Sequence, residues 1–187
     1  IAYAKELGLS LKLLGIAERH GDGISVRVFP CLLYAGHPLA PVEGPFNAVT
    51  VEAPAITEIT ISGPGAGGIE TASAVLADVV SILGGEAPPH HAEERLEVLS
   101  DLESSFYLHL EVADRPRVLA AIADVLGRHE ISVKSVVQRG EGTDARLVMV
   151  THRASEAAFY AALEEISGLD FMRAPARAIR VVEEEYR

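Results

Sequence analysis

The sequence predicts an α+β protein in two parts, the first built from short antiparallel strands and the second from alternating strands and helices. Three observations lead to this fold class. Residues 9–34 contain two runs rich in leucine and β-branched residues on either side of the turn sequence HGDG. Residues 106–182 switch repeatedly between a period-two and a helical apolar pattern. Residues 84–105, with paired glycines, paired prolines and many acids, interrupt both patterns and are expected to form a linker.

The first part, residues 1–83, is expected to contain four strands with a helix at each end. The opening IAYAKELG has the pattern of a helix already under way, and with no initial methionine it suggests an N-terminal truncation. LSLKLLGIAER and GISVRVFPCLL then form a hairpin, and NAVTVEA and ITEITIS form two further strands. The closing helix, residues 69–83, is apolar around most of its circumference, so it requires a cover.

The second part begins with a half-buried strand, FYLHLEV. Its apolar residues from Phe106 to Val112 share one face, and Tyr107, His109 and Glu111 share the other. The helix that follows, in RVLAAIADVLGRHE, has an apolar stripe at positions 118, 119, 122, 125 and 126.

The rest of the second part contains two strands, a helix and a last strand. Two strands come first, ISVKSVVQ and ARLVMVTH. In the helix that follows, Ser155 is the N-cap, Glu156 suits the first turn and Gly168 ends the helix. The closing strand is ARAIRVV. The resulting β-α-β-β-α-β order is the split βαβ, or ferredoxin-like, arrangement. Two helices would cover one face of its sheet and leave the other face to another element.

Composition excludes several classes of function. The 27 acidic and 16 basic side chains give a formal net charge of −11, which disfavours nucleic acid and anionic membranes as partners. A single cysteine, Cys31, allows no internal disulfide and fits a reducing compartment. We find no signal segment, membrane span or metal-ligand spacing, and therefore expect a cytoplasmic protein without a metal site.

The sequence GPGAGG at residues 63–68 matches the G-x-G-x-x-G spacing of a dinucleotide-binding turn. That fingerprint also needs a following parallel strand and an acidic residue about 20 positions on, and this chain has neither. Pro64 in addition has no N–H to offer a phosphate. From the pattern alone, a tight strand-to-helix connection with close packing remains an equal alternative.

The runs AYAKELGLSLKLLGIAE, HPLAPVEGPFNAVTVE and GPGAGGIETASAVLADVV resemble, in order and spacing, the later half of the catalytic region of homoserine dehydrogenase. The resemblance implies that residues 1–83 end a substrate and dimerisation domain. It also implies that Gly63, Pro64, Gly65, Ala66 and Gly67 line the NAD(P) cofactor. The true fingerprint, the proton-donating lysine and the substrate carboxylates would lie upstream. No catalytic residue is therefore expected in this chain, which alone would be inactive.

Residues 106–187 are similar to an ACT domain, an amino-acid-sensing module, on the run FYLHLEVADRPRVLAAIADVLGRHEISVKSVVQ. The effector-binding residues that this implies are Asp114, Arg115, Pro116, Arg117, Val118, Leu119 and Gln138. Pro116 would sit in the first helical turn, and Asp114 would bind an ammonium group or, alternatively, only cap the helix. Arg117 and Glu130 stand where such domains commonly have glycine.

Together the two resemblances imply an NAD(P)-dependent enzyme of threonine and methionine biosynthesis with feedback regulation. Val136 and Val137 on an edge strand favour a homo-oligomer, with L-threonine as the effector. Asp114 and Gln138 of neighbouring copies would share one ligand. The rival interpretation is a non-catalytic regulatory module that binds an amino acid.

Overall fold

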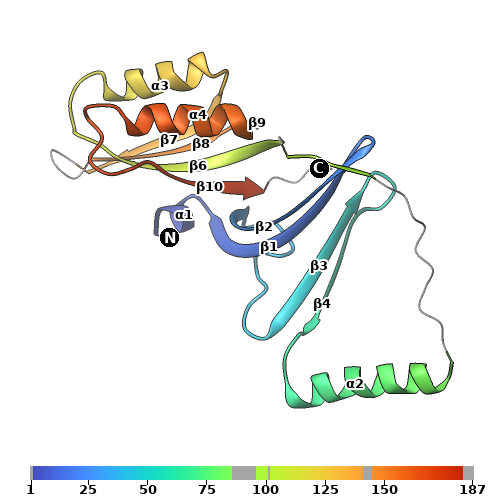
Figure 1. Ribbon diagram of the computed structural model, residues 1–187. Helices are drawn as coiled ribbons and strands as arrows, with labels where there is room; N and C mark the ends of the chain where they lie inside the picture. The colour runs from blue at the N-terminus through green and yellow to red at the C-terminus, as the bar shows by residue number, and fades with distance from the viewer. Residues whose placement is uncertain (1, 86–95, 101, 141–144, 183–187) are drawn as a thin grey trace. The chain divides into compact units, whose positions relative to one another are not determined.

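The computed structural model describes residues 2–85, 96–100, 102–140 and 145–182, which fall into two compact units (Figure 1). The first unit combines the described residues of Ile1–Tyr34 and Glu97–Glu183, and the second lies between Ala35 and Leu96. Residues 86–95 and 101 of the expected linker lie outside the described residues. The division at residues 83 and 106 stays a prediction about domains, whereas the contacts bring both sides of it into the first unit.

The first unit opens with the predicted helix end and hairpin. Helix α1 (Ala2–Glu6) leads into β1 (Leu9–His20), which pairs along its whole length with β2 (Gly23–Tyr34). The turn is closed by the His20–Gly23 pair, and Gly21 takes a positive φ of 60°, a conformation that glycine adopts without steric cost. The predicted hairpin is confirmed.

The ferredoxin-like arrangement is also confirmed. Its elements are β6 (Glu103–Glu111), α3 (Val118–Arg128), β7 (Val133–Arg139), β8 (Arg146–Thr151), α4 (Glu156–Ser167) and β10 (Arg177–Val182). The strands lie in the order β10-β6-β8-β7, and two short strands, β5 (Glu97–Val98) and β9 (Ala154–Ser155), pair with β2 and β6.

The hairpin extends this sheet. Strand β2 pairs in parallel with β10, with Cys31 opposite Arg180 and Leu33 opposite Val182, so the sheet has the order β1-β2-β10-β6-β8-β7. A parallel pair between segments so far apart in the chain leaves no local turn signal, and the sequence did not predict it. The two parts of the sequence therefore share one sheet.

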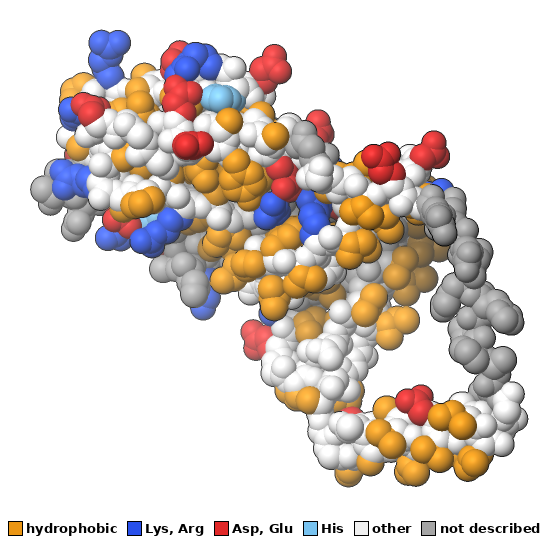
Figure 2. All heavy atoms as spheres, in the orientation of Figure 1, with side chains coloured by type: hydrophobic (Ala, Val, Ile, Leu, Met, Phe, Trp, Pro, Cys, Tyr) orange, Lys and Arg blue, Asp and Glu red, His pale blue; other side chains and the backbone are white. Residues whose placement is uncertain are grey.

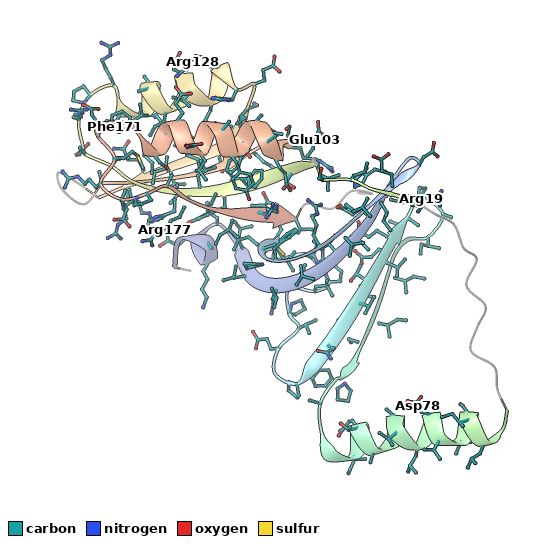
Figure 3. All side chains as sticks on the ribbon, in the orientation of Figure 1. Arg19, Asp78, Glu103, Arg128, Phe171 and Arg177 are labelled. Carbon is teal, nitrogen blue, oxygen red and sulfur yellow. The ribbon has the colours of Figure 1, made fainter. Side chains whose placement is uncertain are left out.

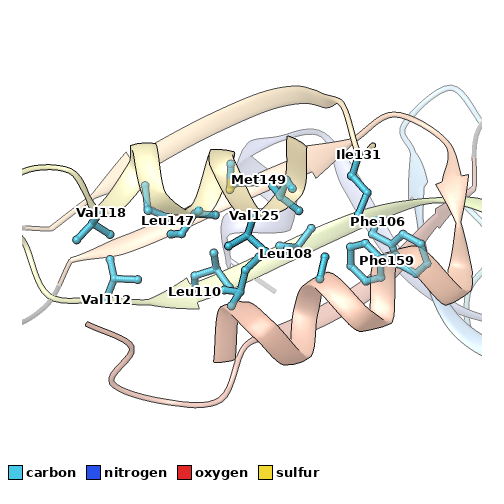
Figure 4. Packing of buried hydrophobic residues seen from close by; sticks show 14 of the residues in the cluster. Phe106, Leu108, Leu110, Val112, Val118, Val125, Ile131, Leu147, Met149 and Phe159 are labelled. Atoms are coloured by element: carbon cyan, nitrogen blue, oxygen red, sulfur yellow. The ribbon is translucent and has the colours of Figure 1, made fainter. Parts of the chain in front are cut away.

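The main core lies between the sheet and its two helices (Figure 4). The rings of Phe106 on β6 and Phe159 on α4 stack with their centroids 3.6 Å apart, and Ile122 and Val125 of α3 are buried beside them. One member of the predicted stripe on α3 is wrong, since Leu119 is 41% exposed. It follows the buried Val118 in the first turn and lines a pocket instead of the core.

The opposite face of the sheet carries a smaller core. Ala4, Leu9 and Leu32 from α1 and the hairpin are buried in one cluster with Tyr107 and Val148 of the ferredoxin-like strands. The expectation that another element covers this face is confirmed. Tyr107, which strand alternation grouped with polar residues, is only 6% exposed because the hairpin segment packs beside it.

The second unit contains the predicted strands β3 (Phe46–Ala53) and β4 (Thr57–Pro64) and the helix α2 (Gly68–Leu83). The strands pair with each other, and the hydroxyls of Thr50 and Thr60 bond across them at 2.8 Å. No residue of α2 is buried among the described residues. Its side chains project freely in Figure 3, and apolar ones gather on it in Figure 2. The cover that the sequence requires for this helix is not supplied by the described chain.

Removal of the stacked ring should test the main core. Phe159→Ala should lower the free energy of unfolding by about 3–5 kcal/mol, because a fully buried ring leaves a cavity against Phe106. The measurement is urea unfolding of the 187-residue chain. Glu164→Ala, an exposed position on the same helix, should stay within about 0.5 kcal/mol of the unmodified chain. Similar losses for both variants would contradict this core.

Candidate functional site

A pocket of about 460 Å³ lies at the start of α3 and collects nearly all the residues that the sequence assigned to an effector. Its lining includes Asp114, Arg115, Arg117, Val118, Leu119 and Gln138. Pro116 alone of the predicted set is not in the lining. The volume falls within the roughly 300–1,000 Å³ typical of small-molecule sites. Gln138 belongs to the same chain as Asp114, so one copy can supply both.

The chain enters α3 differently from the predicted geometry. The helix begins at Val118, its N-cap residue is Arg117, and Pro116 precedes the cap rather than sitting in the first turn. The first helical hydrogen bond runs from the N–H of Ala121 to the carbonyl of Arg117 at 2.9 Å. The alternative in which Asp114 only caps the helix is therefore wrong, because Asp114 lies three positions before the cap.

Arg117 and Glu130 both have a backbone conformation that glycine adopts more readily than other residues. Arg117 has φ 76° and Glu130 has φ 60°, so each lies in the left-handed region. A residue with a Cβ is disfavoured there by roughly 1–2 kcal/mol. At Glu130 the exposed side chain follows the end of α3, and at Arg117 it borders the pocket.

The two arginines of the pocket have different surroundings. Arg115 donates to the Asp170 carboxylate at 2.5 Å and lies over the ring of Phe171, which is labelled in Figure 3. The side chain of Arg117 makes no hydrogen bond or ion pair with any described residue. The charge of Arg115 is therefore already matched, while that of Arg117 is available to a ligand. Apolar side chains, including Val112 and Leu147, form other parts of the lining.

The predicted cofactor loop, Gly63–Gly67, joins β4 to α2 in the second unit. The N–H of Gly65 donates to the carbonyl of Pro45 at 2.8 Å, and a Cβ at Gly65 would collide with the side-chain amide of Asn47. Gly67, with φ 151°, is the N-cap of α2. A side chain at position 65 would thus require the exposed side chain of Asn47 to move, and the role of this loop in cofactor binding stays a prediction.

The most connected charged group in the first unit is one that the sequence assigned only to a helical first turn. Glu156 at the start of α4 accepts hydrogen bonds from Arg180 at 2.9 and 2.6 Å, from Arg27 at 2.8 Å and from the hydroxyl of Ser104 at 2.8 Å. Arg27 also bonds to Glu18 at 2.6 Å. A single carboxylate thereby joins β2, β6, β10 and α4. Arginines inside apolar strands were the available signal for it.

Two opposing effects act on the pKa of Glu156. Burial alone would raise it, but the hydrogen bonds from Arg180 and Ser104 and the charges of Arg180 and Arg27 lower it below the ordinary value. The ionised form is therefore the one that the fold favours.

Cys31, the only cysteine of the sequence, is fully buried in β2, and burial raises its pKa to about 11. The thiol is thus protonated at neutral pH and unsuited to nucleophilic chemistry. Within the described ranges, no group of three or more His, Cys, Asp and Glu side chains is placed to hold a metal ion. None of the described helices is long and apolar enough to cross a membrane.

Two parts of the chain match known protein families. Residues 1–80 match the family described as homoserine dehydrogenase, and residues 107–171 match the ACT domain. A homoserine dehydrogenase of Mycobacterium leprae is 37% identical over 95% of this chain and 44% of its own length. One from Neisseria gonorrhoeae is 35% identical over 97% of this chain and 45% of its own length.

A solved structure gives the same relation. The crystal structure of a homoserine dehydrogenase from Thiobacillus denitrificans is 33% identical, with a TM-score of 0.85 over 97% of this chain and 44% of that chain. Homoserine dehydrogenase structures from S. aureus, at 22% identity and a TM-score of 0.64, share the fold. The chain spans somewhat less than half the length of the relatives it matches.

The Glu156 cluster should make stability depend on acid. Because the folded-state pKa is lowered, the contribution of Glu156 is complete above its unfolded pKa of about 4.3 and is lost as the pH falls through the folded value. Glu156→Gln should therefore lower the free energy of unfolding at pH 7 by about 3 kcal/mol and flatten its decline below pH 4. Urea unfolding at a series of pH values measures both effects.

Glu164→Gln on the exposed face of the same helix is the control and should leave the acid dependence unchanged. An unaltered pH profile for Glu156→Gln would mean that the carboxylate does not hold the four elements together.

Proposed function

This chain belongs to the homoserine dehydrogenase family, as its C-terminal catalytic region followed by an ACT domain, and from that premise we propose the activity of the complete protein. It interconverts L-homoserine and L-aspartate 4-semialdehyde by hydride transfer with NAD(P), in threonine and methionine biosynthesis. The single observation that carries the proposal is the structural match over 97% of the chain to a solved homoserine dehydrogenase. A cytoplasmic location, which fits the one buried thiol, stays a prediction.

The proton donor and the substrate carboxylates belong, in this proposal, to a segment upstream of Ile1. The share of each relative that the chain spans leaves room for such a segment. The exposure of α2 supports the proposed upstream segment, since Ile69, Ile82 and Leu83 are each more than three-quarters exposed. A helix so apolar is stable when another part of the protein covers it.

The chain's own part of the cofactor site is the loop Gly63–Gly67. Bound NAD(P) would supply the hydride acceptor or donor. The loop fits such a group because it is exposed from Pro64 onward and leads directly into a helix of 16 residues. The first N–H groups of that helix point toward an approaching anion, and Gly63 leaves open space beside them. These residues would form one wall of the site.

The pocket at α3 is proposed to bind an amino-acid effector, and L-threonine is the candidate that the family resemblance implies. A homo-oligomer is proposed as well. Leu13, Val26 and Val28 on the hairpin, and Val136 on the edge strand β7, are exposed apolar residues of the kind that pairing between copies would bury. An effector that prefers one arrangement of the copies would shift the population toward it.

The fragment should be inactive by itself. Purified 187-residue chain should show no oxidation of L-homoserine, followed as NAD(P)H absorbance, because the residues that transfer the proton lie upstream. The protein made from the complete coding sequence should be active in the same assay. Activity of the fragment would contradict the division of roles. Inactivity of the complete protein, together with amino-acid binding, would favour the alternative of a regulatory module.

The cofactor loop can be tested in the longer protein with a double-mutant design. Gly65→Ala should raise the KM for NAD(P) about tenfold, because the added methyl group would keep the cofactor from approaching the loop backbone closely. Because a Cβ at position 65 meets Asn47, the same substitution is also made in an Asn47→Ala background. A KM that stays high there supports cofactor contact. A KM restored by Asn47→Ala would assign Gly65 to packing alone.

A further inference from the structure

The charged groups around the α3 pocket are distributed unevenly. Asp114 contributes one negative charge, and Arg115 is matched by Asp170 at 2.5 Å. Arg117 adds a positive charge that no described residue pairs, at the same end of α3 where the helix dipole is positive. The charges of Asp114 and Arg117 therefore offset each other, and the positive end of the α3 dipole adds a partial charge beside the Arg117 guanidinium.

The backbone conformation of Arg117 determines the direction in which its side chain leaves the main chain. Its left-handed conformation is held on both sides. The carbonyl of Arg117 accepts from Ala121 at 2.9 Å, and the N–H of Ala113 donates to Phe171 at 2.9 Å just upstream. Glycine would adopt the same φ without strain and without a side chain. A residue kept in an unfavourable conformation beside a pocket is a candidate for a ligand contact.

The remaining walls limit what can match that charge. Val112, Val118 and Leu147 are buried and apolar, so they offer no carboxylate to Arg117. Gln138 on β7 offers an amide, which can donate or accept but carries no charge. A guanidinium binds a carboxylate in a planar, two-bonded geometry that hydroxyls do not reproduce. A ligand carboxylate would therefore be a suitable partner for the exposed guanidinium of Arg117.

We propose that Arg117 is a specificity-determining residue and that the pocket selects an acidic amino acid, with a second carboxylate, over a neutral one such as L-threonine. This inference rests on the proposed effector pocket. Asp114 faces the ammonium group, the start of α3 faces the α-carboxylate, and Arg117 faces the side-chain carboxylate. An acidic amino acid carries a second carboxylate that L-threonine lacks, and this group would pair with the guanidinium of Arg117.

Calorimetric titration of the 187-residue chain with L-aspartate, L-glutamate and L-threonine tests the proposal. The unmodified chain should bind one of the acidic ligands at least about tenfold more tightly than L-threonine. Arg117→Asn removes the charge while tolerating a positive φ, so it should abolish this preference, and Arg117→Gly should do the same. Arg117→Lys should retain part of the preference. Arg177→Gln, a loss of charge outside the pocket lining, should retain all of it.

The outcomes separate this inference from the effector pocket itself. Equal or tighter binding of L-threonine by the unmodified chain would overturn the role of Arg117 and leave the pocket intact. Binding of L-threonine only after Arg117→Gly would also overturn it, by showing that the arginine closes the site. If no variant that retains its unfolding transition binds any of the three ligands, both the effector pocket and the inference fail.

Discussion

The carboxylate of Glu156 is the interaction on which the first unit depends. It receives two arginines from strands that lie far apart in the sequence, Arg27 of β2 and Arg180 of β10, and a hydroxyl from β6. Each arginine inside a sheet would be costly alone, since a partly buried charge without a partner destabilises a fold. One acid at the start of α4 satisfies both, and the guanidinium of Arg180 also lies over the ring of Phe29 at 4.5 Å. The parallel contact between β2 and β10 is thus secured by charge as well as by the backbone.

A consequence of that contact is that the segments of the two family matches have no separate sheets among the described residues. The hairpin belongs to the dehydrogenase match, while β6, β7, β8 and β10 belong to or flank the ACT match, yet all lie in one sheet. The pocket borders β7 at one end of the strand order, and β1 is at the other end. Paired backbones therefore connect the strand that borders the pocket to the hairpin within one sheet.

Local patterns in the sequence predicted the elements well, because strand alternation, helical stripes and the Ser155 cap are set by neighbours in the chain. The resemblance to an ACT domain, rather than these patterns, indicated the residues of the pocket. Contacts between distant segments were beyond their reach. The parallel pairing of β2, the burial of Tyr107 and the position of Glu156 all depend on a hairpin that docks from the other part of the chain. The N-cap at Arg117 was missed because a left-handed arginine contradicts ordinary capping preferences.

The position of Cys31 gives the sheet a built-in reporter. The thiol lies on β2, opposite Lys12 on one side and Arg180 on the other, and it is closed off from solvent. A thiol reagent can reach it only when the strands separate, so its rate of modification follows the frequency of that local opening rather than intrinsic reactivity. Because the sequence has no second cysteine, the modification of Cys31 should give a single kinetic phase. The rate at which Cys31 is modified thus reports how often the sheet opens where β2 of the dehydrogenase match pairs with β10.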